Sequence, residues 1–108
     1  MIESDNTGSN NIVLGGNIEL VGFKELDGGS MVILKKMIGN HVRKMSETAD
    51  NFEKLTVNLK KVGSGSNKFE IQAKLMDNGR PVTSEVTDFN LFFTIDKALR
   101  QIQNQIAK

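Results

Sequence analysis

The sequence lacks most of the residue types that carry catalysis or bind metal ions. It contains no cysteine, which excludes disulfide bonds, a cysteine nucleophile and any metal site with thiolate ligands. His41 is its one histidine, so a metal site built from several histidines is excluded as well. It contains no tryptophan and no tyrosine, and its six aromatic residues are all phenylalanine. These absences leave shape, charge and apolar surface as the means by which the chain can act.

Motifs for nucleotide binding and for nucleophilic catalysis are missing too. The chain has no P-loop, no Rossmann fingerprint and no Gly-x-Ser-x-Gly elbow. Its carboxylates are scattered, without a recognisable pair for general acid-base catalysis. His41 lies near the edge of an apolar helical stripe, where a surface or structural role is expected. We therefore expect a protein that is not an enzyme and that uses no cofactor, no metal ion and no small-molecule substrate.

Long apolar runs are absent as well. No window approaches the roughly 18 consecutive apolar residues of a membrane-spanning helix. Met1 is not followed by a basic segment and a long apolar run, so no signal peptide is expected. With 108 residues and a hydrophobic fraction of 38%, the chain is predicted to be one soluble cytoplasmic domain with no membrane contact.

Charge is unevenly distributed along the chain, although the net charge is only +1. Residues 1–26 carry one lysine and four acidic residues, whereas residues 27–108 carry thirteen cations and nine acidic residues. The balance is −3 in the first part and +4 in the second. A mildly basic body is a weak indication of a polyanionic partner.

The chain is predicted to consist of a flexible N-terminal extension at residues 1–16 and a single α+β domain at residues 17–108. The extension is rich in Asn, Ser, Gly and acidic residues, which is typical of segments that do not pack. Within the domain, hydrophobic periodicity predicts strands at 17–23, 54–62, 68–76 and 80–86, and helices at 30–46 and from about 88 to 107.

Turn and capping residues support these bounds. Asp27 is a suitable N-cap for the first helix, and Thr87 with Asp88 for the second. The dipeptide Asn78-Gly79 predicts a tight hairpin between the last two strands, because both positions tolerate positive φ. Pro81 has no N–H group for a strand ladder, which favours an edge position for the last strand.

The order of these elements predicts an α+β fold, β-α-β-β-β-α. The last three strands are joined by short connections and form an antiparallel meander. The first strand is joined to them through a crossing helix, so it is expected to pair in parallel with a neighbour. The two amphipathic helices cover one face of the resulting four-stranded mixed sheet. This arrangement is similar to that of double-stranded-RNA-binding domains.

The basic residues of the two helices predict a surface for nucleic acid. Two helices on one face of a sheet can present their outer surfaces as one ridge, which lysines at the end of a strand can extend. Phosphate contacts need only positive charge and a fixed shape, and A-form RNA is recognised mainly by its shape and backbone. The alternative is that these cations form an ordinary solvated surface. The candidate RNA-binding residues are Lys35, Lys36, Arg43, Lys44, Lys60, Lys61, Lys97, Arg100 and Lys108.

Several segments of residues 17–108 follow the pattern of a known family. The first predicted strand, NIELVG at 17–22, ends in glycine, and the segment ADNFEK at 49–54 leads from the first helix into the strand LTVNL. The final segment, DFNLFFTIDKALRQI at 88–102, places an acidic residue before apolar and aromatic residues that are followed by Ile-Asp. In order, spacing and length, the chain resembles the short ribosome hibernation-promoting factors, also called ribosome-associated inhibitors or ribosomal subunit interface proteins.

This resemblance implies a function in translation. It implies binding of a monomer to the small ribosomal subunit, and so to ribosomal RNA, in the channel used by messenger and transfer RNA. The implied mechanism is occlusion, in which a rigid basic wedge blocks initiation and protects idle ribosomes under stress without catalysing a reaction. The basic residues of both helices are the ones that the resemblance implies in binding.

Two other functions stay open. The chain could bind double-stranded RNA through the same fold, although the start of its last helix lacks the lysines of that family. It could also be a protein-interaction module that uses the uncovered sheet face or an edge strand, for example around Arg80–Val86. Cations that converge from both helices favour RNA, whereas intermingled acidic residues such as Glu47, Asp50 and Asp96 favour the protein-interaction module.

Overall fold

The structure, a computed structural model, describes residues 11–14, 17–63 and 68–107. The described residues form five strands and two helices. In chain order these are β2 (Asn11–Leu14), β3 (Ile18–Val21), α1 (Gly28–Thr48), β4 (Phe52–Val62), β5 (Lys68–Asp77), β6 (Arg80–Asp88) and α2 (Leu91–Ile106). Each strand and helix that the sequence predicts is present, close to its expected bounds.

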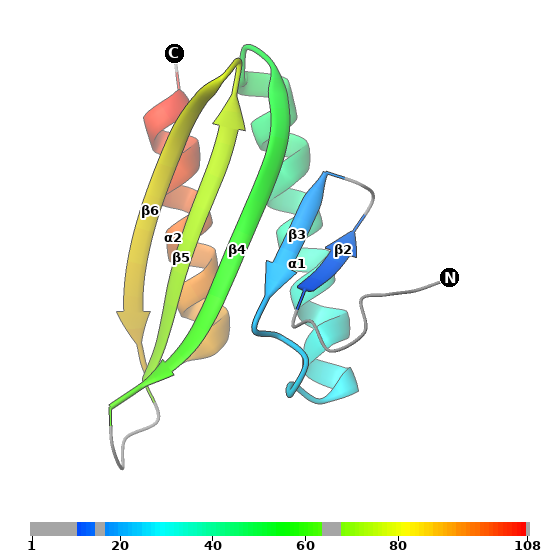
Figure 1. Cartoon of the computed structure of the whole chain (residues 1–108), viewed down its shortest axis with the longest axis vertical. Helices are drawn as coiled ribbons and strands as arrows, with labels where there is room; N and C mark the ends of the chain where they lie inside the picture. Colours follow the sequence, from blue (N-terminus) through cyan, green and yellow to red (C-terminus); the bar gives the residue numbers. More distant parts are fainter. Residues whose placement is uncertain (1–10, 15–16, 64–67, 108) are drawn as a thin grey trace.

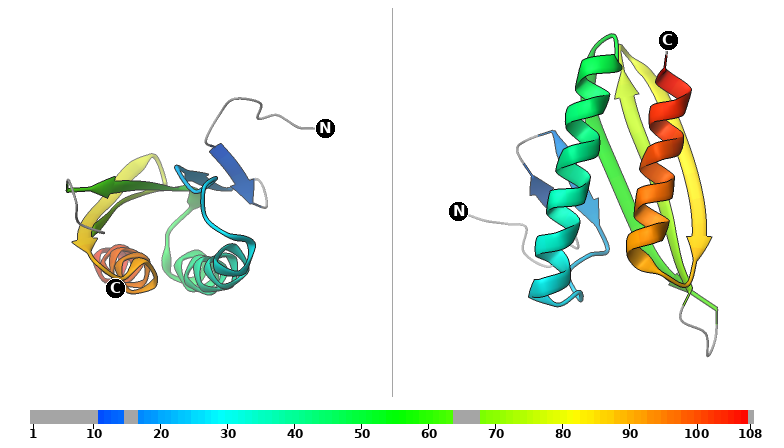
Figure 2. Two further views of the ribbon diagram at one scale, coloured as in Figure 1. Left: turned by 90° about the horizontal axis from the view of Figure 1, so that it is seen from below. Right: turned by 180° about the vertical axis from the view of Figure 1, so that it is seen from behind.

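The strands of the described chain form one sheet in the order β2-β3-β4-β5-β6 (Figure 1). β3 and β4 pair in parallel, and the other neighbours pair antiparallel. Both helices cover the same face of the sheet and run in the same direction along it (Figure 2). The predicted β-α-β-β-β-α fold with two helices on one face is therefore confirmed, and β6, which contains Pro81, is an edge strand.

Strand β2 adds a fifth strand to the four that the sequence predicted. It lies within residues 1–16, which we expected to be a flexible extension, and it pairs antiparallel with the whole of β3. Ile12 lies opposite Leu20 and packs against the core, so the backbone of this segment joins the sheet. The other residues of the predicted extension, 1–10 and 15–16, lie outside the described residues.

Both helices begin at a side-chain cap. Asp27 caps α1 as predicted: it accepts a hydrogen bond of 2.6 Å from a backbone N–H of the first turn, and this bond lowers the pKa of its carboxyl. α2 is capped by Asn90, whose Oδ1 accepts from the N–H of Phe93 at 2.9 Å. The prediction of Thr87 and Asp88 as the cap was wrong, because both residues still pair with β5 and continue the strand.

The core lies between the sheet and the two helices. Alternation along the strands and helical spacing along α1 and α2 predicted which side chains point inward, and most of these are buried while the rest are partly buried against the core. Because both helices pack on the same core, their outer surfaces are held in fixed positions relative to each other. The largest fully buried side chains are Phe23, Leu20, Leu34, Ile38, Met45, Leu55, Ile71, Leu75, Ile95, Leu99, Ile102 and Val57.

Positive φ angles occur in the hairpin between β5 and β6 and at Gly22, among other positions. The hairpin between β5 and β6 turns at Asn78 and Gly79, with φ of 53° and 81°, as the sequence predicted. Gly22, which follows β3, has φ of 86°, and a Cβ atom there would lie 2.3 Å from the backbone oxygen of Leu59 on β4. Both the dihedral angle and the close approach of the two backbones therefore require glycine at position 22.

We expect Gly22→Ala to lower the free energy of unfolding by about 3 kcal/mol, since it adds a backbone clash to the cost of a positive φ. Gly79→Ala is the matched control, because its φ is also positive but no atom lies within 4 Å of the added Cβ. The control should lower the free energy of unfolding by about 1–2 kcal/mol. Urea unfolding followed by far-ultraviolet circular dichroism measures both. If the two variants lose the same free energy of unfolding, the close approach of the Gly22 and Leu59 backbones does not contribute.

Candidate nucleic-acid interface

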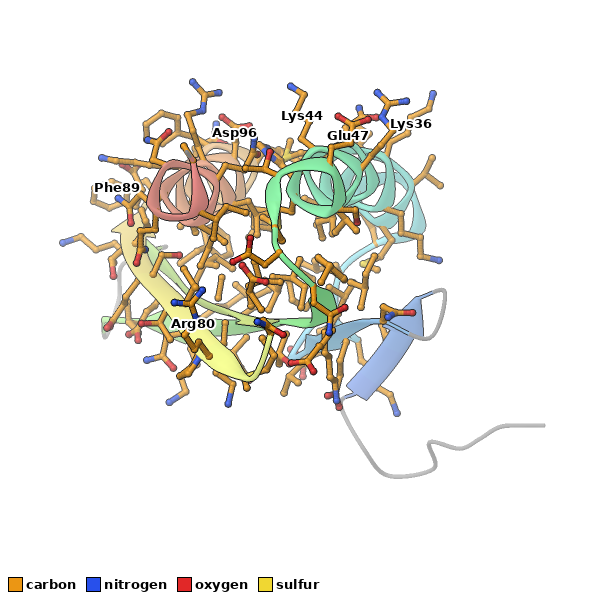
Figure 3. All side chains as sticks on the ribbon, turned by 90° about the horizontal axis from the view of Figure 1, so that it is seen from above. Lys36, Lys44, Glu47, Arg80, Phe89 and Asp96 are labelled. Atoms are coloured by element: carbon orange, nitrogen blue, oxygen red, sulfur yellow. The ribbon has the colours of Figure 1, made fainter. Side chains whose placement is uncertain are left out.

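Cations from both helices lie on the surface turned away from the sheet, which we call the helix face. Lys36 and Arg43 are exposed and about two helical turns apart, so they lie on the same flank of α1. Lys97 and Arg100 are exposed on α2. Figure 3 shows Lys36 and Lys44 pointing away from the sheet on the outer side of α1. The structure therefore brings together basic residues of both helices, as the sequence predicted.

A groove separates the two helices on the helix face. It has a volume of about 420 Å³ and contains a cation from each helix, Lys44 and Arg100. Its lining residues are Met37, Asn40, His41, Lys44, Asp96, Arg100 and Gln103. The two helices therefore form paired ridges with a polar floor between them.

Three of the nine predicted residues lie apart from this convergence, and a fourth is not among the described residues. Lys35 is nine residues, or about two and a half helical turns, from Lys44, so it lies on the flank of α1 turned away from the groove. Lys60 is on the sheet face opposite the helices, and Lys61 is exposed beside it near the end of β4. Lys108 lies outside the described residues. The candidate interface is therefore centred on Lys36, Arg43, Lys44, Lys97 and Arg100.

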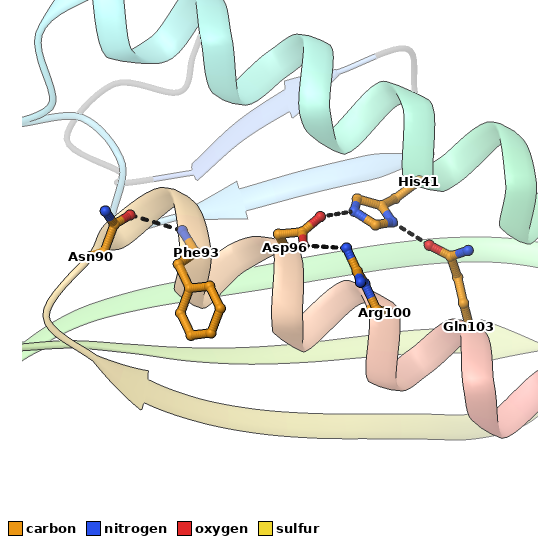
Figure 4. A network of polar contacts seen from close by, with 6 residues as sticks. All are labelled: His41, Asn90, Phe93, Asp96, Arg100 and Gln103. Carbon is orange, nitrogen blue, oxygen red and sulfur yellow. Dashed lines mark hydrogen bonds and ion pairs between the residues drawn. The ribbon is translucent and has the colours of Figure 1, made fainter.

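A polar network lies at the floor of the groove and joins the two helices (Figure 4). Nε2 of His41 lies 2.8 Å from Oδ1 of Asp96, and Nδ1 of His41 contacts Oε1 of Gln103. A carboxylate can only accept, so Nε2 carries the proton of the first contact. The second oxygen of Asp96 accepts from Arg100 at 2.7 Å. His41 is buried and links α1 to α2, so it has the structural role that its place in the sequence predicted.

Acidic residues reduce the charge of the helix face without cancelling it. Within the described helices there are six cations and two carboxylates, a balance of +4. Asp96 partly neutralises Arg100, and Glu47 is exposed near the end of α1. Asp50, the third acid considered from the sequence, forms an ion pair of 3.3 Å with Arg80 at the hairpin between β5 and β6. The face is thus basic, with two acidic interruptions.

Two exposed phenylalanines lie at the start of α2, and neither was among the candidate residues from the sequence. Phe89 precedes α2 and Phe93 lies in its first turn, and their exposed fractions are 62% and 49%. The Nζ atom of Lys68 lies 5.3 Å from the Phe89 ring centroid, and that of Lys97 lies 5.8 Å from the Phe93 ring centroid. Phe93 is two residues from the buried Ile95, which places it about 200° away on the opposite side of the helix, so helical periodicity contained the signal for its exposure.

The opposite face of the sheet has a shallow polar hollow of about 590 Å³. It is lined by Thr56, Asn58, Gln72, Ala73, Lys74, Thr83, Ser84 and Glu85. Cationic and acidic residues are both present, so this face lacks the consistent positive charge of the helix face.

The described residues contain no group of three or more His, Asp or Glu side chains that could hold a metal ion. Neither described helix is long and apolar enough to cross a membrane.

Several solved structures are similar to this chain. One is the N-terminal domain of Protein Y from Thermus thermophilus, with a TM-score of 0.62, 18% identity, and coverage of 83% of this chain and 91% of that one. Another is a ribosomal subunit interface protein from Coxiella burnetii, with a TM-score of 0.57, 10% identity, and coverage of 83% and 90%. This chain has their fold. Neither a protein-family model nor a curated protein matches its sequence.

The shared fold agrees with the family resemblance seen in the sequence. The fold that the resemblance implied is the fold observed, over most of the chain and of both solved structures. At 18% and 10% identity, what this chain shares with the two proteins is their fold, and the charges of its surface come from its own residues.

We expect Asp96→Asn to lower the free energy of unfolding by about 1–3 kcal/mol, because an amide cannot replace the charged contacts with His41 and Arg100. Glu47→Gln makes the same chemical change at an exposed residue of α1 and should alter the free energy of unfolding by less than about 0.5 kcal/mol. Thermal or urea unfolding monitored by circular dichroism compares the two. If both variants unfold like the wild type, the network does not hold the helices together.

Proposed function

We propose that this chain binds the small ribosomal subunit and blocks translation by occupying its RNA channel, as a hibernation factor without catalytic activity. The observation that carries the proposal is the convergence of cations from two parallel helices on one face. Its support from comparison is the fold shared with a protein named as a ribosomal subunit interface protein. In this proposal the chain acts in the cytoplasm as a monomer, with ribosomal RNA as its partner and with no cofactor.

The architecture suits recognition of RNA by shape and charge. The helices pack on one core and are joined by the His41 network, so the cations of α1 and α2 keep a fixed spacing. A rigid arrangement of cations can contact phosphates without contacting bases, which is how A-form RNA is mainly recognised. Occlusion requires only that such a rigid body fill a channel, so the mechanism needs no reacting group.

Binding of RNA through the cations of the helix face is expected to depend on salt. Each phosphate contact releases counterions, so the logarithm of the binding constant falls linearly with the logarithm of the salt concentration. Exposed charges are also screened over about 10 Å at 0.1 M ionic strength. We therefore expect tight binding at low salt and clearly weaker binding at about 0.2 M salt.

A protein-interaction module is the second candidate function. It is favoured by the two acidic interruptions of the helix face, Asp96 and Glu47, and by the mixed polar hollow on the opposite sheet face. In that case the sheet face, rather than the helix face, contacts the partner. The two candidates therefore predict sensitivity to charge on opposite faces of the same sheet.

We expect the double variant Lys44→Glu with Lys97→Glu to bind small ribosomal subunits at least tenfold more weakly, because it reverses one cation on each helix. The control is Lys60→Glu with Lys74→Glu, which makes the same change in net charge on the opposite sheet face. The control should bind within about threefold of the wild type. Co-sedimentation with purified small subunits at about 50 and 200 mM salt gives the affinities and the salt slopes.

Each result of this comparison has a separate meaning. If the wild type does not sediment with subunits at low salt, ribosome binding is wrong. If both double variants weaken binding equally, the helix face is not the contact surface. If only the control weakens binding, the sheet face is the contact surface, as the second candidate predicts.

A further inference from the structure

The start of α2 presents two aromatic rings to solvent on the edge of the helix face. Phe89 is 62% exposed and Phe93 is 49% exposed. We call these two residues the aromatic pair. Figure 3 shows Phe89 on the flank of α2 turned away from α1. Among the described residues, the other exposed large apolar side chains are Val32 and Ile33 of α1, which are not aromatic.

The backbone that carries the aromatic pair is held by several hydrogen bonds, three of which involve side chains. The N–H of Phe89 donates to Oδ1 of Asp88 at 2.6 Å, and the N–H of Phe93 donates to the Asn90 side chain at 2.9 Å. The hydroxyl of Thr94 donates to the carbonyl of Asn90 at 2.6 Å. The rings are thus exposed on a fixed turn, so a ligand that stacks on them need not order the chain first.

One lysine lies over each of the two rings. Nζ of Lys68 lies 5.3 Å from the Phe89 ring centroid and Nζ of Lys97 lies 5.8 Å from the Phe93 ring centroid. Lysine is a flexible point charge, so its ammonium can leave the ring face for a nearby phosphate while remaining beside it. An aromatic ring with an adjacent cation matches the two parts of a nucleotide, its base and its phosphate.

We propose that the aromatic pair stacks on unpaired bases of RNA while Lys68 and Lys97 bind the phosphates of the same nucleotides. This inference rests on the proposed function and specifies the kind of RNA that the start of α2 contacts. Bases in a double helix are stacked on one another, so an exposed ring on a rigid turn can reach only unpaired ones. The lysine beside each ring favours a polyanion over an apolar protein surface.

The two rings differ from the cations of the helix face in how their contacts depend on salt, and Lys97 belongs to both groups. Stacking adds affinity that depends little on salt, whereas each phosphate contact adds to the salt slope. Replacing a ring should therefore lower affinity at every salt concentration by a similar factor. Replacing a lysine should lower the salt slope by about one.

The test uses the full chain with three partners: an unstructured 12-nucleotide RNA, a 12-base-pair RNA duplex, and small ribosomal subunits. The variants are Phe89→Leu with Phe93→Leu, the same two positions changed to Tyr, and Lys97→Gln, with Val32→Ala as the control at an exposed aliphatic residue. We expect the double Leu variant to bind the single strand and the subunits about tenfold more weakly, with an unchanged salt slope. The double Tyr variant and the control should bind within about twofold of the wild type.

The outcomes separate this inference from the proposed function. If the subunits bind and the Leu variant binds all partners as well as the wild type, the stacking proposal is wrong and ribosome binding stands. If the subunits do not bind but the single strand binds and loses affinity in the Leu variant, ribosome binding is wrong and stacking stands. An equal loss for the duplex, or a loss in the Tyr variant as large as in the Leu variant, would also overturn stacking.

Discussion

The contact of His41 with Asp96 and Gln103 determines how the cations of the helix face lie relative to one another. It joins two helices that otherwise meet through apolar packing, and it lies at the floor of the groove in which Lys44 and Arg100 converge. A buried imidazole needs a partner for each of its nitrogens, and Asp96 and Gln103 of α2 supply them. The rigid spacing that a shape-based RNA contact needs therefore depends on this one buried ring and on the apolar core beneath it.

Asp96 has two opposing effects on the candidate function. Its carboxylate holds His41 and Arg100, which stabilises the helix pair, but it also removes positive charge from the surface that would contact phosphates. The described helices carry a balance of +4, and one of their six cations, Lys35, lies on the flank turned away from the groove, so phosphate contacts alone give the helix face modest electrostatic attraction. The aromatic pair at the start of α2 offers a second source of affinity that salt does not screen. In such an interface, shape and stacking would add to the affinity that a limited positive charge provides.

The sequence was sufficient for the fold where the signals are local. Alternation in β4 and β5, helical spacing in α1 and α2, and Asn78-Gly79 each predicted the observed element. Strand β2 was missed because its short apolar run lies in a segment rich in Asn, Ser and Gly, and because its pairing with β3 is a tertiary contact. For the candidate site, spacing predicted the exposed cations, but the contact of His41 with Asp96 joins residues 55 positions apart and no local pattern indicates it. The ion pair that partly neutralises Arg100 is different, because Asp96 and Arg100 are four residues apart on one helix and their spacing in the sequence already indicates it.

The most direct test of the account is a cryo-electron microscopy map of the small ribosomal subunit with this chain bound at low salt. The account predicts density for the β-α-β-β-β-α fold within the channel for messenger and transfer RNA. In that density α1 and α2 should face ribosomal RNA, and the sheet should face away from it. Density outside the channel, or density in which the open sheet face contacts the RNA while both helices face solvent, would contradict the central claim.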